Sequence, residues 1–418
     1  MDLFIVLAII LGLSGLFSYI NERLLHLETS IGLMLLALGV SIFAAVLGAF
    51  GTMEFIDAQR QFVEELDLGE TLLKGVLCFM LFAGSVNVKL KFLDEEKWLI
   101  GSLAIGGTLV AWLLIGGMLW GIAVLFGREV SPIYLFLFGA LIAPTDPIAA
   151  LAILGRAGLP DRLEAIISGE SLFNDGVGVV LFTMCLAIAI APVQPTFGEA
   201  VVLFLHEVLG GIALGACAAA LMNRMLKRSE DYGTQLLVSL SIVALTYGLA
   251  EHIEVSGPIA SVVTGLLIGN FARPKMAEAA RARFDTFWHG IDEILNAMLF
   301  VLIGLNIVLV YPIEGFPAAV TAIVVCLIAR AISVHIPIAF LRRTSALKTD
   351  GFGLTKLLTW GGLRGGLALA LALSIPDAPD KASVLYMTYA VVAFSIIVQG
   401  LTISRFFKPD ELVRIIKK

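Results

Sequence analysis

Residues 138–150 read FGALIAPTDPIAA, an apolar stretch in which Asp146 lies between two prolines. Pro144 and Pro147 each remove a backbone hydrogen-bond donor and disfavour helical geometry at the residue before them, so a helix through this stretch must break at Thr145 and Asp146. The break frees backbone carbonyls and half-helix ends beside a carboxylate, an arrangement that can hold a cation. The simpler alternative is a proline kink whose aspartate is only hydrogen-bonded.

The composition of the whole chain is that of a membrane protein. The chain has 418 residues, of which 59% are hydrophobic and 15% are charged, and its mean hydropathy is +0.97. Because soluble domains carry about 25% charged residues, a water-soluble enzyme is excluded, as are a disordered chain and a secreted disulfide scaffold. We predict an all-α polytopic membrane protein with about thirteen spans, at residues 3–20, 29–50, 69–88, 98–126, 131–154, 164–190, 200–222, 234–252, 257–271, 287–310, 316–340, 354–375 and 383–406.

The lysines and arginines divide sharply between the two sides of this predicted topology. Twenty-one of the 28 fall in loops after odd-numbered segments, whereas only Arg60, Arg128 and Lys381 fall in loops after even-numbered ones. Cytoplasmic loops carry the excess of positive charge. We therefore predict an outer N-terminus and a cytoplasmic C-terminus, and the clean division favours the count of thirteen.

Five ionisable residues lie deep inside the predicted spans, where each costs about 2.5–3.5 kcal/mol and is a functional candidate. Three are acidic: Asp146, and Glu170 and Asp175 of the sequence GESLFNDG. Helical spacing places Ser171 one turn before Asp175 and puts Asn174 on the neighbouring face. Two carboxylates, an amide and a hydroxyl form a set of hard oxygens that suits Na⁺, K⁺ or H⁺.

The other two are arginines, Arg330 in the eleventh segment and Arg364 in the twelfth. A lone buried arginine needs a partner. Arg364 lies in GGLRGG, whose glycines permit either close helix packing or unwinding. Segment 5 is the fifth of segments 1–6, and segment 12 is the fifth of segments 8–13. Because the two sets are offset by seven segments, an odd number, corresponding segments cross the membrane in opposite directions. Two interrupted helices at matching positions of inverted six-helix repeats mark the binding site of a transporter.

Several function classes are excluded by what the sequence lacks. It contains no ATP-binding loop and no nucleic-acid-binding patch, and its four cysteines have no metal-site or redox spacing. The stretch GESLF lacks the last glycine of a nucleophile elbow, so we expect no enzyme activity. A channel would repeat one pore segment, and none is visible. A Na⁺-coupled symporter of an organic anion remains an alternative, although the acidic cluster argues against it.

Four motifs together resemble the monovalent cation/proton antiporters, in particular their NhaP-type bacterial and archaeal members, to which the animal sodium/proton exchangers are related. They occur in order over segments 5 to 12: APTDPIAA (143–150), GESLFNDG (169–176), CLIARAISV (326–334) and GGLRGG (361–366). The resemblance implies exchange of Na⁺ or Li⁺ for H⁺ across the plasma (inner) membrane of a prokaryote, in pH homeostasis. Exchange of K⁺ for H⁺ by the same fold is the alternative. No cofactor is expected beyond the transported ions.

The resemblance also implies the site. Asp175 matches the residue that holds the cation in the family, and the other contacts match Asp146, Ser171, Glu170 and the Thr145 carbonyl, with Asn174 in support. These residues would bind the transported Na⁺. Glu170 also matches the partner of a buried arginine, which is Arg330 in this sequence.

The domain organisation follows from the same resemblance. It implies a homodimer in lipid, with a dimerisation domain formed by residues 1–97 and 234–315. The core transport domain would comprise residues 98–190 and 316–408, and residues 191–233 would form a linker helix. The broken helices 5 and 12 would cross near the middle of the membrane.

The charges of the five deep residues suggest a stoichiometry. Three carboxylates and two arginines leave one net negative charge, which one Na⁺ or one H⁺ can neutralise. Burial disfavours the bare carboxylate, so a proton competes with the cation. Arg364 is expected to offset Asp146. A core that moves only when neutral would exchange the two ions one for one, electroneutrally, by alternating access.

Overall fold

The computed structural model describes residues 3–49, 71–190, 197–229, 231–306, 316–343, 349–376, 378 and 380–416. The regular elements in these ranges are all helical, which confirms the predicted all-α class. The first half of the chain forms α1 (Leu3–Ile20), α2 (Thr29–Ala49), α4 (Thr71–Val86), α5 (Leu90–Glu95), α6 (Lys97–Gly101), α7 (Thr108–Leu125), α8 (Pro132–Ile142), α9 (Ile148–Arg156) and α10 (Asp161–Ile190). The second half forms α11 (Phe197–Leu226), α12 (Tyr232–His252), α13 (Gly257–Leu267), α14 (Glu278–Asn306), α15 (Phe316–Arg343), α16 (Gly351–Gly361), α17 (Gly366–Leu373), α18 (Lys381–Phe394), α19 (Leu401–Phe406) and α20 (Pro409–Ile416).

The helices are those of a multi-pass membrane protein. Within the described residues, eight helical stretches are long and apolar enough to cross a bilayer, judged by length and composition. Shorter apolar helices cover Thr29–Ala44, Val76–Val86 and Pro132–Ile142. A span that is divided by a break consists of two shorter helices and is not among these eight. The count of thirteen spans therefore stays a prediction.

Both predicted breaks are present in the structure. Residues 143–147 separate α8 from α9, and residues 362–365 separate α16 from α17. The two non-helical segments meet: the backbone N–H of Asp146 donates to the carbonyl of Leu363 over 2.8 Å, as part of an isolated antiparallel bridge. The prolines of one segment and the glycines of the other thus bring two helix breaks side by side.

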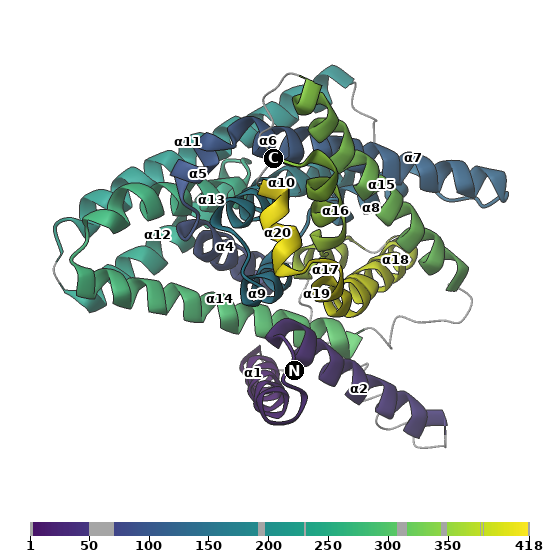
Figure 1. The fold of residues 1–418 in the computed structure, drawn as a ribbon, viewed down its shortest axis with the longest axis horizontal. Coiled ribbons are helices and arrows are strands. Elements are labelled where there is room, and N and C mark those ends of the chain that lie inside the picture. The colour runs from purple at the N-terminus through teal and green to yellow at the C-terminus, as the bar shows by residue number, and fades with distance from the viewer. Residues whose placement is uncertain are drawn as a thin grey trace.

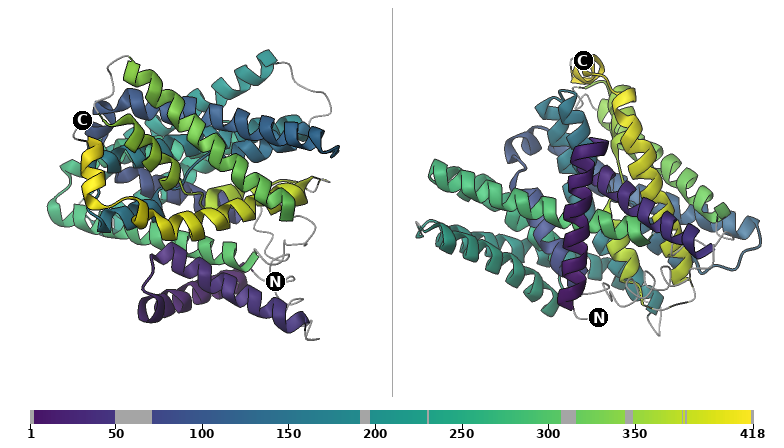
Figure 2. Two further views of the ribbon diagram at one scale, coloured as in Figure 1. Left: turned by 45° about the vertical axis from the view of Figure 1, so that its right-hand side comes forward. Right: turned by 90° about the horizontal axis from the view of Figure 1, so that it is seen from below.

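The helices fall on two sides of the molecule. In Figure 1, α4, α5 and α11–α14 lie on one side, α7, α8 and α15–α19 lie on the other, and α9 and α10 lie between them. The long helix α14 packs mainly against α2 and α4, while α15 packs against α7, α16 and α18. Figure 2 shows α1 and α2 at one edge of the molecule, beside α14. The expected linker, α11, packs against α12 and α13.

Among the described residues, two short α-helices lie outside the predicted spans. One is α5, which precedes the fourth span, and the other is α20, which follows the last one. In α20 the side chains of Leu412 and Ile415 are buried, and the Ile415 carbonyl accepts a hydrogen bond from the N–H of Asp350 over 2.8 Å. The chain after the last span is therefore attached to the start of α16.

Candidate functional site

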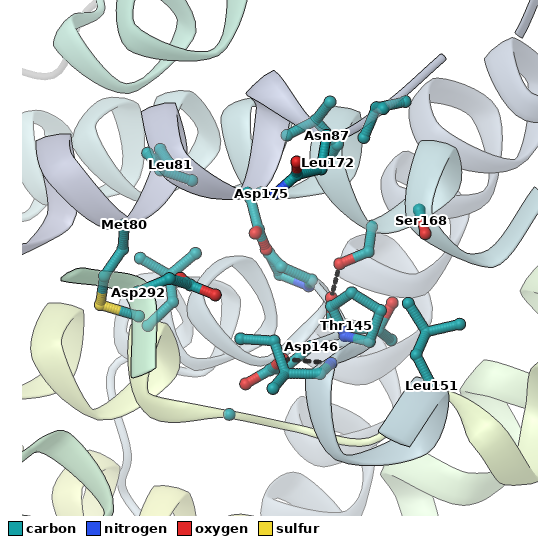
Figure 3. A pocket seen from close by; sticks show the side chains of 18 of the residues that line it. Met80, Leu81, Asn87, Thr145, Asp146, Leu151, Ser168, Leu172, Asp175 and Asp292 are labelled. Carbon is teal, nitrogen blue, oxygen red and sulfur yellow. Dashed lines mark hydrogen bonds between the residues drawn. The ribbon is translucent and has the colours of Figure 1, made fainter. Parts of the chain in front are cut away.

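The two breaks form part of the wall of a cavity of about 430 Å³, shown in Figure 3. Helices from both sides of the molecule contribute to it, α4 and α14 from one and α17 from the other, with α10 between them. Its ionisable lining residues are Lys89, Asp146, Asp161, Glu164, Asp175, His289 and Asp292. Five carboxylates against one lysine make the field inside the cavity negative, which concentrates cations there.

Asp175 is the carboxylate on α10 that lines this cavity. Its side chain projects inward and is half-buried. No hydrogen bond or ion pair from a described residue reaches its carboxylate, whereas the other acids of the break region are bonded, as shown below. A carboxylate without a partner in the middle of an apolar helix is costly unless an ion or a proton occupies it.

Thr145 is fixed in place by two residues of α10. The Ser171 hydroxyl donates to the Thr145 carbonyl. The Asn174 amide donates to the Thr145 hydroxyl over 3.0 Å, and its oxygen accepts from the Thr145 N–H over 3.3 Å. Because α10 holds the non-helical chain in this way, the oxygens of Thr145 and Ser171 keep a set position at the cavity wall, within one turn of Asp175.

Asp146 has a structural role as well as a place in the cavity. Its Oδ1 accepts from the N–H of Ile148 over 2.9 Å, which satisfies one of the free donors at the start of α9 and puts negative charge at the positive end of that helix. Its Oδ2 lies against Gly365, where any side chain would overlap it. The glycine at position 365 is thus required by the close approach of the Asp146 carboxylate.

Arg364 contacts backbone carbonyls at the end of α8. Its Nη1 donates to the carbonyl oxygens of Ala143 and Pro144, to the latter over 2.6 Å, and its backbone N–H donates to the Ser395 hydroxyl over 2.9 Å. The described contacts of Arg364 include no ion pair with Asp146, so the expected compensation of the Asp146 charge by Arg364 stays a prediction. Arg364 contacts these carbonyls because the break leaves them without helical donors, and this negative helix end attracts the guanidinium.

Arg330 and Glu170 form a buried ion pair with two parallel hydrogen bonds. Arg330 Nη1 lies 2.5 Å from Glu170 Oε1, and Nη2 lies 3.1 Å from Oε2. The side chains are only 7% and 2% exposed. Arg330 Nε and Nη2 also donate to the carbonyl of Leu358, in the last turn of α16, over 3.2 Å and 3.0 Å. Arg330 therefore satisfies the end of one half-helix, as Arg364 does for the other.

The structure divides the predicted site residues into two groups. Thr145, Asp146, Ser171 and Asp175 line the cavity together, whereas Glu170 and Asn174 are absent from its lining and are bonded to Arg330 and Thr145 instead. The sequence analysis missed Asp292, which also lines the cavity. The signal that could have found it is an acidic residue inside the apolar run 287–310.

We predict that Arg330→Ala lowers the free energy of unfolding by about 3–5 kcal/mol, because it leaves the Glu170 carboxylate and the Leu358 carbonyl buried without their donor. Glu170→Ala should cost a similar amount. The double variant should lose less than the sum of the two, since the contact is already absent in each single variant. Thermal or denaturant unfolding in detergent measures all three.

The matched control is Lys97→Ala, which breaks the exposed pair of Lys97 with Asp94, 2.9 Å apart. Exposed pairs contribute little, so this variant should change stability by less than about 0.5 kcal/mol. Strict additivity of the Arg330 and Glu170 losses would show that the buried pair contributes nothing through direct contact.

Comparison with known families and structures identifies the family of this chain. The family model described as "Sodium/hydrogen exchanger, transmembrane" matches residues 3–408 of the chain. The Na⁺/H⁺ antiporter NhaP of Pseudomonas aeruginosa is 40% identical over 402 residues, which cover 95% of each chain. The Na⁺/H⁺ antiporter NhaH of Halobacillus dabanensis is 32% identical over 414 residues, or 97% of this chain and 98% of that one.

Among solved structures, the fold matches that of the sodium proton antiporter MjNhaP1 from Methanocaldococcus jannaschii. The TM-score is 0.77 at 17% sequence identity, and the match covers 100% of both chains. The resemblance seen in the four sequence motifs is thereby confirmed. The chain belongs to the sodium/hydrogen exchanger family and is an NhaP-type member of it.

Proposed function

We propose that this protein exchanges Na⁺ for H⁺ across a membrane and that the Asp175 carboxylate carries either ion. The observation that supports this most is that Asp175 has no partner among the described residues, in a cavity that it shares with Asp146, the Ser171 hydroxyl and the Thr145 carbonyl. Membership of the exchanger family and the names of its relatives, which are called Na⁺/H⁺ antiporters, support the same reaction.

The chemistry of competition at Asp175 is simple. A carboxylate in a shielded site favours neutralisation, and either a bound Na⁺ or a bound proton supplies it. Oxygens from a carboxylate, a hydroxyl and a carbonyl suit a hard monovalent cation. Because one carboxylate cannot hold both ions, binding of Na⁺ on one side of the membrane displaces the proton, and protonation on the other side releases Na⁺.

Transport requires that this site reach both sides in turn. In our proposal the chain has thirteen spans in two inverted six-helix repeats, with α8–α9 and α16–α17 as the broken helices 5 and 12. The moving core comprises residues 98–190 and 316–408. The static dimerisation domain comprises residues 1–97 and 234–315, so that a homodimer holds the cores apart. Separate packing of α14 with α2 and α4, and of α15 with α7 and α18, supports this division.

The cavity opens to the cytoplasm in this proposal. Lys89, Asp161 and Glu164 line it and belong to the loops and helix ends on the side that carries most of the positive charge. An outer N-terminus, a cytoplasmic C-terminus and a prokaryotic inner membrane follow from the same charge distribution and from the bacterial relatives.

The charges at the crossing of the breaks support an electroneutral cycle. Glu170 is paired with Arg330, and Arg364 lies beside the break that holds Asp146. The count of three carboxylates and two guanidinium groups therefore leaves one negative charge, at Asp175. One Na⁺ or one H⁺ neutralises it, so each half-cycle moves a site without net charge.

We predict that Asp175→Asn reduces exchange to the level of liposomes without protein. The amide keeps the shape of the side chain but can neither take up a proton nor balance a cation. Because no described residue is bonded to the Asp175 carboxylate, the variant should unfold at the same temperature as the wild type. Proton flux reported by a dye in proteoliposomes, scanned with Na⁺, Li⁺ and K⁺, measures the effect and tests K⁺/H⁺ exchange.

The control for this variant is Asp94→Asn, which removes the same charge from an exposed aspartate outside the cavity. It should exchange at the wild-type rate. Sustained Na⁺-driven proton flux in Asp175→Asn would refute the assignment of Asp175 as the carrier.

We also predict that the exchange is insensitive to membrane potential. One uncompensated charge crossing 100 mV would gain or lose about 2.3 kcal/mol, enough to shift the end-point of exchange far from the ion gradients. The measurement is Na⁺/H⁺ exchange with the potential fixed by K⁺ and valinomycin, after flux with K⁺ alone has been tested. An end-point that moves with the fixed potential would contradict one-for-one exchange.

A further inference from the structure

A carboxylate that lies outside the proposed core also lines the cavity. Asp292 is on α14, whose main packing partners are α2 and α4, and it projects into the space that Asp146 lines from the break before α9 and Asp175 lines from α10. Of the five acidic residues of the cavity, the other four belong to residues 98–190. Among the described residues, Asp292 is thus the one lining carboxylate on the opposite unit.

The surroundings of Asp292 leave one of its oxygens available. Asn296, one turn further along α14, donates to Asp292 Oδ1 over 3.1 Å and also to the Asp292 carbonyl over 2.9 Å. No described residue donates to Oδ2. The side chain is half-buried and faces the cavity, whereas the neighbouring Glu293 is exposed, lies outside the lining and pairs with His289 over 3.4 Å.

We propose that Asp292 recruits Na⁺ into the cavity and passes it to Asp175, and that it does so from the cytoplasmic side alone. The proposal rests on the function proposed above. A carboxylate at the wall raises the local concentration of cations by its field. When the core moves, Asp175 leaves and Asp292 stays with α14, so the outward-facing site loads without it.

The position of Asp292 on α14 also explains why its carboxylate, which is additional to those of Asp146, Glu170 and Asp175, is compatible with one-for-one exchange. A charge that stays with the static unit never crosses the membrane, so it does not enter the charge balance of the moving core. Asp292 therefore affects the loading of the cation and not the number of ions exchanged per cycle. Its substitution should alter the half-saturating Na⁺ concentration on one side and leave the maximal rate nearly unchanged.

The experiment uses membrane vesicles turned inside out, so that the cytoplasmic face meets the medium. Uptake of radioactive Na⁺ then reports loading from the cytoplasm, and efflux from preloaded vesicles reports loading from outside. In Asp292→Asn, the half-saturating concentration for uptake should rise about three- to tenfold at low salt, the order of effect expected when one unit charge at the wall of a water-filled cavity is removed. The value for efflux should not change.

Two further variants make the result specific. Glu293→Gln removes the same charge from the next residue, which lies outside the cavity lining, and should match the wild type in both directions. Asp292→Glu keeps the charge and should restore most of the uptake affinity.

Each outcome decides between the two proposals. Uptake of Na⁺ by the wild type, driven by a proton gradient and absent from vesicles without the protein, tests exchange itself. If the wild type exchanges Na⁺ and Asp292→Asn matches it in both directions, or is impaired equally in both, the side-specific role is overturned while exchange stands. If the wild type moves no Na⁺, the proposed function fails and the role of Asp292 fails with it.

Discussion

The fold depends on hydrogen-bond donors for the backbone carbonyls that two helix breaks leave unpaired inside an apolar bundle. An unpaired carbonyl at membrane depth costs several kcal/mol, so non-helical chain survives there only where protein groups or water satisfy it. Two buried guanidinium groups do this here: Arg364 bonds the carbonyls of Ala143 and Pro144, and Arg330 bonds that of Leu358. Each arginine places positive charge at the negative end of a half-helix.

The acidic residues around the two helix breaks differ in their bonding partners, and we assign them different roles for this reason. Glu170 is saturated by Arg330, and Asp146 caps α9 with one oxygen while the other lies against Gly365. Asp175 keeps its carboxylate open to the cavity. Fixed partners hold the crossing in one geometry, and in our proposal Asp175, to which no described residue is bonded, is the acid that exchanges the ions. The same reasoning separates Asn174, which holds Thr145, from Ser171, which adds an oxygen to the cavity wall.

Local sequence chemistry predicted the first break, because the prolines of APTDPIAA act on the backbone within a few residues. The glycines of GGLRGG permitted either close packing or unwinding, and the second break was expected from its matching position in the inverted repeats and from the family resemblance. Local sequence chemistry also predicted the polar face of GESLFNDG, because helical spacing fixes which side chains share a face. It could not predict the partner of Arg364, since this depends on where a distant chain break lies in space. The acidic residue Asp292 inside the apolar run 287–310 was a usable signal, but its place in the cavity depends on how α14 packs against α4 and α17, which the sequence does not give.

The central claim is that Na⁺ and H⁺ compete for one carboxylate, and proton release on Na⁺ binding tests it most directly. The protein in detergent, in weakly buffered solution near neutral pH, would receive Na⁺ while the pH is recorded and heat is measured in parallel. The account predicts release of up to one proton per protomer for each Na⁺ bound, and none from Asp175→Asn. Binding of Na⁺ that releases no proton, or release that persists without Asp175, would contradict it.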